Sequence, residues 1–399
     1  MTSITIAGNG IAELTCAWLL ARRGHRIRLA DRVTGGWHPL ILNEPTLELL
    51  RMLWHPEQIL LEGTWPLTHR EVRWGPKGTV EPIMQTARVA DGAQLAHRMR
   101  NQLLHHPATL ETTARETAPA AVDANADAAL TERTVERALE WTVSAEPPTG
   151  THLWEAGRRH LLWGVAPLLS EQDEATARMD TSVSGWLHLT PLGHRMALLQ
   201  AMVPGPVERP AEMLARMLTE SNLKTRLVRA PGSVTALPAA PRLHCAPARA
   251  PTPHMPGHLH VGAGAIRFDP LSGTGTAQAL RTAILAAAVI GTTSQGAPPE
   301  HLCAHYTARL NRAFRTHLRT CAQLYNEAFT SPDWRSEHDA MRHRPSAVFD
   351  TSLHLDTDRL LPSTKATDPL QNNRSTEVRS VVMTRRDTAP AADTRHEPS

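Results

Sequence analysis

Two glycines near the N-terminus, Gly8 and Gly10, stand between an apolar run and a stretch of helical composition. The run Ile4-Thr5-Ile6-Ala7 predicts a short buried strand, and the residues up to about Arg23 predict a helix. Gly8 permits a tight turn there, and Gly10 lets the backbone approach a phosphate that the free N–H groups of the helix N-terminus can bind. The segment therefore predicts a pyrophosphate-binding turn.

The residues after this helix complete a strand–helix–strand unit. Gly24 ends the helix, and Arg26–Ala30 reads as the next strand. Asp31 follows that strand, where a carboxylate accepts hydrogen bonds from the ribose of an adenosine, and we include Arg32 beside it in the predicted site. Together these features predict that a Rossmann-type unit at the N-terminus binds a dinucleotide.

Glu13 departs from this pattern, because Gly, Ala or Pro normally stands there and lets the helix pack closely on the strand. A glutamate that points to solvent would leave the phosphate undisturbed. One that faces the turn would oppose the phosphate's negative charge. The sequence leaves both orientations open.

A second glycine-rich segment runs from Val261 to Gly275 and follows another predicted strand, Leu259-His260-Val261. At this point the chain resembles the FAD-dependent monooxygenases with the p-hydroxybenzoate hydroxylase fold, in which a late glycine-rich turn opens a helix that faces the flavin ring. Backbone N–H groups of such a loop can stabilise charge on a reduced flavin. The resemblance adds these residues to the cofactor-binding set: Gly262, Asp269, Pro270, Gly273 and Gly275.

A third segment, Gly185-Trp186-Leu187-His188-Leu189-Thr190-Pro191, is similar to the GWxWxIP motif of flavin-dependent halogenases, with His188 and Thr190 as departures. Within that branch the layout resembles the flavin monooxygenases that mature quinohemoprotein amine dehydrogenase. The shared features are Asn43–Leu47, Arg73-Trp74-Gly75, the Gly-Trp segment and the region from Cys321 to Trp334. The general resemblance covers residues 2–345.

Other positions depart from the family pattern. Ala263 stands where an aspartate usually contacts the ribityl chain, and Glu155–Arg159 matches a family turn only partly. Ala90-Asp91-Gly92 stands where an arginine often precedes the helix after the first hairpin. Backbone groups or other residues would therefore have to make several contacts to the flavin.

The resemblance implies FAD as cofactor, O2 as oxidant and hydroxylation of an aromatic or indole substrate, with a Trp of a protein subunit as one such substrate in tryptophylquinone formation. No second GxGxxG segment is present, so electrons would come from transient NAD(P)H or a separate reductase. We select Asp269 and His188 as candidate catalytic groups, and Trp186 with His188 as the wall of the substrate cavity.

Three alternatives stay open. A flavin-dependent halogenase needs a catalytic lysine, and the one near the expected offset, Lys77, falls in the predicted turn Gly75–Gly78, where lysines are usually solvated. A dehydrogenase-type oxidoreductase would share the fold and remove hydride from a small aromatic metabolite. A non-catalytic homologue would fit Glu13 and Ala263.

The predicted fold class is α/β (α+β), with a Rossmann-type FAD-binding domain, an interleaved antiparallel sheet domain and C-terminal helices. The FAD-binding domain takes residues 1–65, 86–165 and 255–298, and the substrate domain takes 66–85 and 166–254. C-terminal helices occupy 299–345, and 361–399 is a predicted disordered tail. A proline-rich connection is expected at 231–256.

Composition narrows the function classes. Hydrophobic residues make up 41% of the 399, which is enough for a sizeable core. The formal charge is +3, and the arginines are interspersed with acidic residues, so we expect no nucleic-acid surface. The longest apolar run near the C-terminal half, Ile284–Ile290, is too short to span a bilayer. The cysteines are scattered, with no metal-ligand spacing, so we expect a cytoplasmic protein with buried thiols and no metal.

Overall fold

The computed structural model describes residues 3–30, 36–55, 58–76, 78–112, 140–146 and 153–342. The predicted ribose contacts Asp31 and Arg32, the turn residue Lys77 and the predicted tail 361–399 lie outside the described residues. Met1–Asp350 forms one compact unit. The division of this part of the chain into two domains stays a prediction.

The N-terminal strand–helix–strand unit is confirmed as β1 (Ser3–Ile6), α1 (Ile11–Ala21) and β2 (Arg26–Ala30). The two strands are parallel neighbours in a sheet of order β15-β16-β7-β1-β2-β6. The other members are β6 (Thr109–Thr112), β7 (Glu140–Ser144), β15 (Ala248–Arg249) and β16 (Gly257–His260). Since β16, β7, β1, β2 and β6 are parallel to their neighbours, their carboxyl ends lie at one edge.

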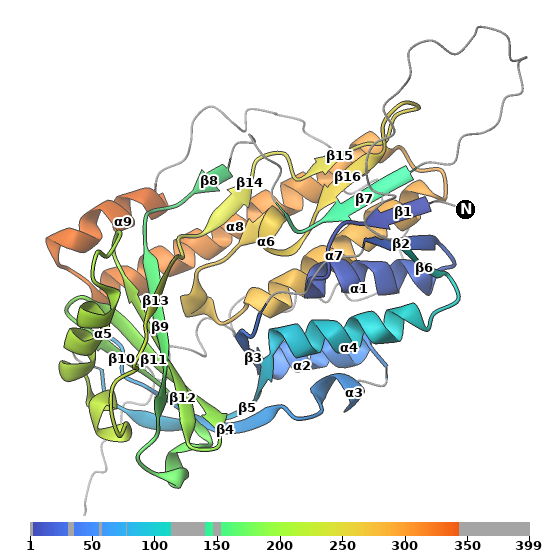
Figure 1. Ribbon diagram of the computed structural model, residues 1–399. Coiled ribbons are helices and arrows are strands. Elements are labelled where there is room, and N and C mark those ends of the chain that lie inside the picture. The colour runs from blue at the N-terminus through green and yellow to red at the C-terminus, as the bar shows by residue number, and fades with distance from the viewer. Residues whose placement is uncertain are drawn as a thin grey trace, which may run out of the picture. The chain divides into compact units, whose positions relative to one another are not determined.

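Helices pack against this sheet. In Figure 1, α1 lies between α7 (Gly275–Thr293) and α4 (Gly92–Leu104), and it contacts both. The C-terminal helices predicted at 299–345 are present as α8 (Pro299–Ala328) and α9 (Pro332–Arg342), and α2 (Glu44–Leu53) also contacts α7. Two short helices, α3 (Gln58–Leu61) and α6 (Gly262–Ala265), complete this part. No described helix is long and apolar enough to cross a membrane.

The second sheet has the order β13-β9-β12-β11-β10-β4-β5-β3, and all its pairs are antiparallel except β10 with β4. Its strands are β3 (Pro39–Asn43), β4 (Trp65–Val72), β5 (Glu81–Asp91), β9 (His160–Pro167), β10 (Thr176–Ser182), β11 (Gly185–Gly193), β12 (Met196–Val203) and β13 (Thr235–Pro238). The second sheet therefore includes β3 and β9, and β3 and most of β9 lie in residue ranges that were predicted to belong to the FAD-binding domain.

Because successive side chains of a strand point to opposite sides, the second sheet has two different faces. Leu187, Leu189 and Leu199 belong to an apolar core that includes Leu214 and Met217 of α5 (Pro210–Thr219). The side chains between them in sequence lie on the opposite face, which is the face that lines the cavity described below.

The expectation for 231–256 was partly wrong, because the proline-rich connection contains strands. β13 pairs with β9, and β15 pairs with β16, at the edges of the two larger sheets. β14 (Arg242–His244) joins β8 (Leu153–Glu155) and β17 (Ile266–Arg267) in a third small sheet. Edge positions tolerate proline, since one side of the strand needs no hydrogen bonds, and the partners are distant in sequence. The 3-10 turns η2 (Glu171–Asp173), η3 (Asn222–Arg226) and η4 (Pro270–Ser272) complete the elements.

Candidate active site

A cavity of about 640 Å³ lies between the first sheet's helices and the second sheet. Its wall includes the turn Gly8–Glu13 before and at the start of α1, the start of α4 at Gly92 and the segment around α6 and the N-terminus of α7. Thr190, Leu198 and Gln200 line it from the second sheet. One cavity thus joins both glycine-rich segments to the strand that carries the Gly-Trp motif.

At the α1 end, the predicted pyrophosphate turn is present, and Glu13 faces it. The Glu13 side chain is only 3% exposed. Its Oε2 accepts a hydrogen bond from the Gly10 N–H at 2.9 Å, and its Oε1 accepts one from the Ala145 N–H at 2.7 Å. A Cβ added to Gly8 would lie 2.2 Å from Oε1, so the carboxylate packs directly against Gly8 and would have to shift for any larger residue there. The orientation toward solvent is therefore excluded.

At the α7 end, Pro270, Gly273 and Gly275 line the cavity, and their contact with a cofactor stays a prediction. Gly273 has φ 60°, a left-handed conformation that favours glycine, and no heavy atom lies within 4 Å of a Cβ added to it or to Gly275. Gly262, at φ 55°, also lines the cavity, and its N–H donates to Thr282 Oγ1. Gly273 and Gly275 thus leave open space at the N-terminus of α7, whereas an added Cβ at Gly262 would lie 3.0 Å from Ala12 Cβ.

On the sheet side, Trp186, His188 and Thr190 alternate along β11 and share the face that lines the cavity. Thr190 lies in the wall, and the Nδ1 atom of His188 is 3.1 Å from its hydroxyl oxygen. His188 is also the cross-strand partner of Gln200, another wall residue. Burial lowers the pKa of His188 to about 4, so the ring is neutral at pH 7.

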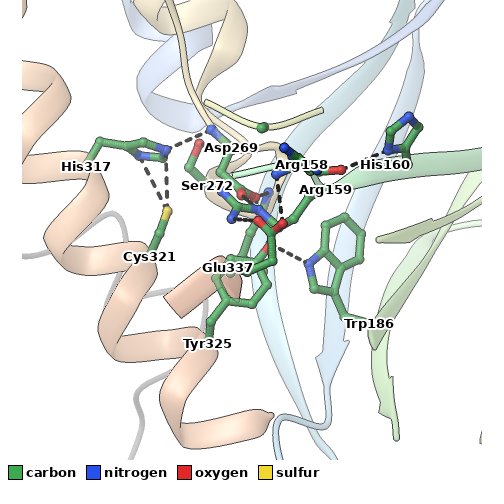
Figure 2. A network of polar contacts seen from close by, with 12 residues as sticks. Arg158, Arg159, His160, Trp186, Asp269, Ser272, His317, Cys321, Tyr325 and Glu337 are labelled. Atoms are coloured by element: carbon green, nitrogen blue, oxygen red, sulfur yellow. Dashed lines mark hydrogen bonds and ion pairs between the residues drawn. The ribbon is translucent and has the colours of Figure 1, made fainter. Parts of the chain in front are cut away.

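Asp269 lies behind the α7 loop, in a buried polar network (Figure 2). Its Oδ1 caps η4 by accepting the Leu271 N–H at 2.9 Å, and its Oδ2 accepts from Arg159 Nε at 3.0 Å. The Tyr325 hydroxyl donates to Oδ1 at 3.0 Å. Phe268 and Pro270 line the cavity on either side of Asp269 in sequence, whereas the Asp269 carboxylate is engaged with Arg159 and Tyr325.

Arg159 joins this carboxylate to the C-terminal helices. Its Nη1 donates to Glu337 Oε2 of α9 at 2.6 Å, and Glu337 Oε1 also accepts the Arg158 N–H at 2.7 Å. Burial lowers the pKa of the Arg159 guanidinium, but Asp269, Tyr325 and Glu337 more than reverse this, so its pKa is raised overall. Arg159 is therefore charged, and it lies between two carboxylates with no exposure of its side chain.

Aromatic and polar side chains of α8 and β11 close the network. The Trp186 Nε1–H donates to the Tyr325 hydroxyl at 3.0 Å, so Trp186 packs on the network. Burial and the nearby Asp269 raise the pKa of Tyr325, which stays protonated as a donor. Figure 2 shows His317 of α8 on the other side of Asp269, where its Nε2 accepts the Asp269 N–H at 2.7 Å. Burial lowers the pKa of His317 to about 4, consistent with a neutral acceptor.

The structure places the predicted site residues partly in the cavity wall and partly in the adjoining polar network. Gly8, Gly10, Gly262, Pro270, Gly273 and Gly275 line one cavity. Trp186 and Asp269 lie in the adjoining network, and His188 lies between the network and the cavity wall. Sequence reasoning missed Gln200 as a wall residue, although a polar residue in the apolar run Met196–Val203 was a signal for it. No metal-binding group of three His, Cys, Asp or Glu occurs among the described residues.

No protein-family model matches the chain, and no curated protein sequence matches it. Solved structures do. The peptidyl tryptophan dihydroxylase QhpG, essential for tryptophylquinone cofactor biogenesis, has a TM-score of 0.66 at 19% identity, over 86% of this chain and 79% of that chain.

Two further structures show the same likeness. The flavin-dependent halogenase CmlS has a TM-score of 0.65 at 15% identity, over 84% of this chain and 67% of its own. PqsL, a probable FAD-dependent monooxygenase from Pseudomonas aeruginosa, has a TM-score of 0.62 at 14% identity, over 86% of this chain and 99% of its own. The chain therefore has the fold shared by FAD-dependent monooxygenases and flavin-dependent halogenases.

Proposed function

We propose that this protein is an FAD-dependent monooxygenase that hydroxylates an aromatic ring. The observation that carries the proposal is the single cavity that joins the turn before α1, the N-terminus of α7 and a polar patch on the second sheet. A dinucleotide with a planar ring at one end fits this arrangement, since helix N-termini favour anionic groups and the polar patch faces the ring end.

The residues present fit FAD over most of its length. The turn at Gly8–Gly10 would receive the pyrophosphate, and the open space at Gly273 and Gly275 would receive the flavin ring at the N-terminus of α7. Asp31 and Arg32 are proposed for the ribose. Glu13 would oppose the pyrophosphate and is a misfit on the described wall. When bound, FAD supplies the redox chemistry with O2, and the protein supplies position and electrostatics.

On the substrate side, Thr190 and Gln200 present the polar atoms of an otherwise apolar stretch of wall that includes Leu198. Groups of this kind orient an aromatic substrate by hydrogen bonds while the apolar surface excludes water. His188, the other candidate catalytic group, is proposed as an adjoining hydrogen-bonding group rather than as an acid or base. Because its pKa is lowered to about 4, it would act as a neutral hydrogen-bond partner rather than as a cation.

Asp269 is proposed as a positioning residue. Its carboxylate caps η4 and is held by Arg159 and Tyr325, so it would act by fixing the loop Pro270–Gly273 in front of α7. A direct catalytic contact, the other hypothesis for Asp269, would require the carboxylate to leave a buried ion pair. Leaving Arg159 with one partner fewer in the interior is costly.

For the substrate we propose an indole, and a Trp side chain of a protein partner as the specific form. The likeness to the peptidyl tryptophan dihydroxylase supports this choice, at 19% identity. NAD(P)H or a separate reductase is proposed as the electron donor. Halogenation and hydride removal are the competing reactions of the same fold.

The test begins with the visible spectrum of the purified protein, before and after addition of FAD. Stoichiometric flavin binding supports the proposal and is followed by supply of NAD(P)H, or a flavin reductase, with isotopically labelled O2 and a Trp-bearing peptide. Mass spectrometry should find label in the peptide. Oxidised peptide without label would indicate a dehydrogenase, and a protein that binds no flavin would indicate a non-catalytic role.

A further inference from the structure

The Glu13 side chain occupies the anion-binding position of the N-terminal turn. Its two oxygens each accept one backbone N–H: Gly10 from the turn itself, at 2.9 Å, and Ala145 from the end of β7, at 2.7 Å. β7 is the neighbour of β1 in the sheet, so the carboxylate bridges the ends of two adjacent strands. A negatively charged group with two acceptor oxygens is what a phosphate would otherwise present there.

The Glu13 carboxylate also offsets the positive end of the α1 helix dipole. α1 begins at Ile11 with Gly10 as its N-cap, and Glu13 is the acidic residue of its first turn. The positive end of the helix dipole, which a pyrophosphate normally uses, therefore already faces a negative charge. Since Glu13 is 3% exposed, solvent screens this charge little.

The surroundings keep the side chain in this position. The carboxylate lies against Gly8, where an added Cβ would come within 2.2 Å of Oε1. Rotation of Glu13 away from the turn would leave the N–H groups of Gly10 and Ala145 without this acceptor. A dinucleotide must therefore either displace the carboxylate or bind beside a like charge.

We propose that Glu13 sets the affinity and occupancy of the dinucleotide site by acting as an internal substitute for the pyrophosphate. It stabilises the turn without ligand and weakens the binding of FAD. This inference rests on the proposed function, because it concerns the same cofactor site. It predicts that removal of the charge strengthens cofactor binding while it weakens the ligand-free protein.

The experiment compares the full-length wild type with Glu13→Gln and Glu13→Ala. Glutamine keeps the length and one acceptor oxygen but carries no charge, whereas alanine removes the side chain. FAD is titrated against each protein and the dissociation constant is taken from the flavin fluorescence. The melting temperature of each ligand-free protein is measured in parallel. Glu44→Gln is the matched control, since Glu44 is the exposed first-turn glutamate of α2.

We expect both Glu13 variants to bind FAD at least tenfold more tightly than the wild type, with Glu44→Gln unchanged. Ligand-free Glu13→Ala should melt at a lower temperature than the wild type, because two N–H groups lose their acceptor. Inorganic pyrophosphate should raise the melting temperature of Glu13→Ala more than that of the wild type.

The outcomes distinguish the proposed role of Glu13 from the proposal that the protein binds FAD. Equal FAD affinity in the wild type and in Glu13→Gln overturns the role of Glu13 and leaves the flavoprotein proposal standing. Binding by the variants alone supports the role of Glu13 in its strongest form. Failure of all the proteins to bind FAD overturns both, because an uncharged turn would then still reject the cofactor.

Discussion

Replacement of Glu337 by alanine tests whether the buried network holds the α7 loop. Glu337 accepts hydrogen bonds from Arg159 Nη1 at 2.6 Å and from the Arg158 N–H at 2.7 Å, and its side chain is 3% exposed. Loss of one partner from a buried ion pair costs about 3–5 kcal/mol, because a charge is left partly uncompensated in the interior. Arg159 keeps Asp269, so the lower part of that range is expected.

The measurement is thermal unfolding followed by tryptophan fluorescence, since Trp186 and Trp334 lie next to the network. At about 1.5 °C per kcal/mol for a chain of this size, a loss of about 3–4 kcal/mol should make Glu337→Ala melt roughly 4–6 °C lower than the wild type. Glu337→Gln keeps an acceptor oxygen for one of the two donors and should lose less. Glu212→Ala is the control, because Glu212 pairs with Arg209 at 3.3 Å with both side chains exposed, and such a pair contributes about 1 kcal/mol or less.

Equal losses in Glu337→Ala and Glu212→Ala would refute the reasoning, since burial would then make no difference to the value of the ion pair. A second readout tests the link to the cofactor site. Arg159 joins Glu337 to Asp269, which caps η4, so FAD affinity should fall in Glu337→Ala and stay unchanged in Glu212→Ala. A large loss of stability with no change in affinity would show that the network holds α9 but not the loop.

Four further variants test single features in and beside the cavity. Burial lowers the pKa of His188 from 6.5 to about 4, so the unfolded chain takes up the proton first as the pH falls. Between pH 7 and pH 5 the free energy of unfolding should therefore fall by up to about 2 kcal/mol more in the wild type than in His188→Gln, as measured by urea unfolding. Gln200→Leu should raise the KM for the aromatic substrate about tenfold, the value of one hydrogen bond. Gly273→Ala should cost about 1 kcal/mol of stability because of its positive φ, whereas Gly275→Ala, with equally open space, should cost nothing measurable by thermal unfolding.

The parts of the fold that were predicted from sequence are those determined over short distances. The strand–helix–strand unit at the N-terminus and the helix that begins at Gly275 follow from apolar periodicity bounded by glycine. The cavity glycines follow from the same local signals. The short strands β13 and β15 were missed, because they exist only through pairing with β9 and β16, and nothing in their own composition specifies that pairing.

The polar network was beyond sequence reasoning for the same reason. Arg159 is separated by 110 residues from Asp269 and by 178 from Glu337, and its neighbour Arg158 gives no sign that only one of the two side chains is buried. Asp269 could be recognised as part of a flavin loop but not as the partner of a buried arginine. The positioning role proposed for Asp269 rests on the contacts of its carboxylate with Arg159 and Tyr325.

Glu13 shows where a local pattern stops being sufficient. The residues around Gly10 predict a phosphate-binding turn, and the turn forms as predicted. Whether it is open to a phosphate depends on Ala145, the residue that follows β7, whose N–H gives the Glu13 carboxylate its second donor. Without that donor the Glu13 carboxylate would lose one of these two hydrogen bonds beside Gly8, and water would compete for the carboxylate. The two ends of the cavity are thus determined differently: distant charges hold the α7 end in place, while the α1 end is formed locally and then occupied by the chain's own anion.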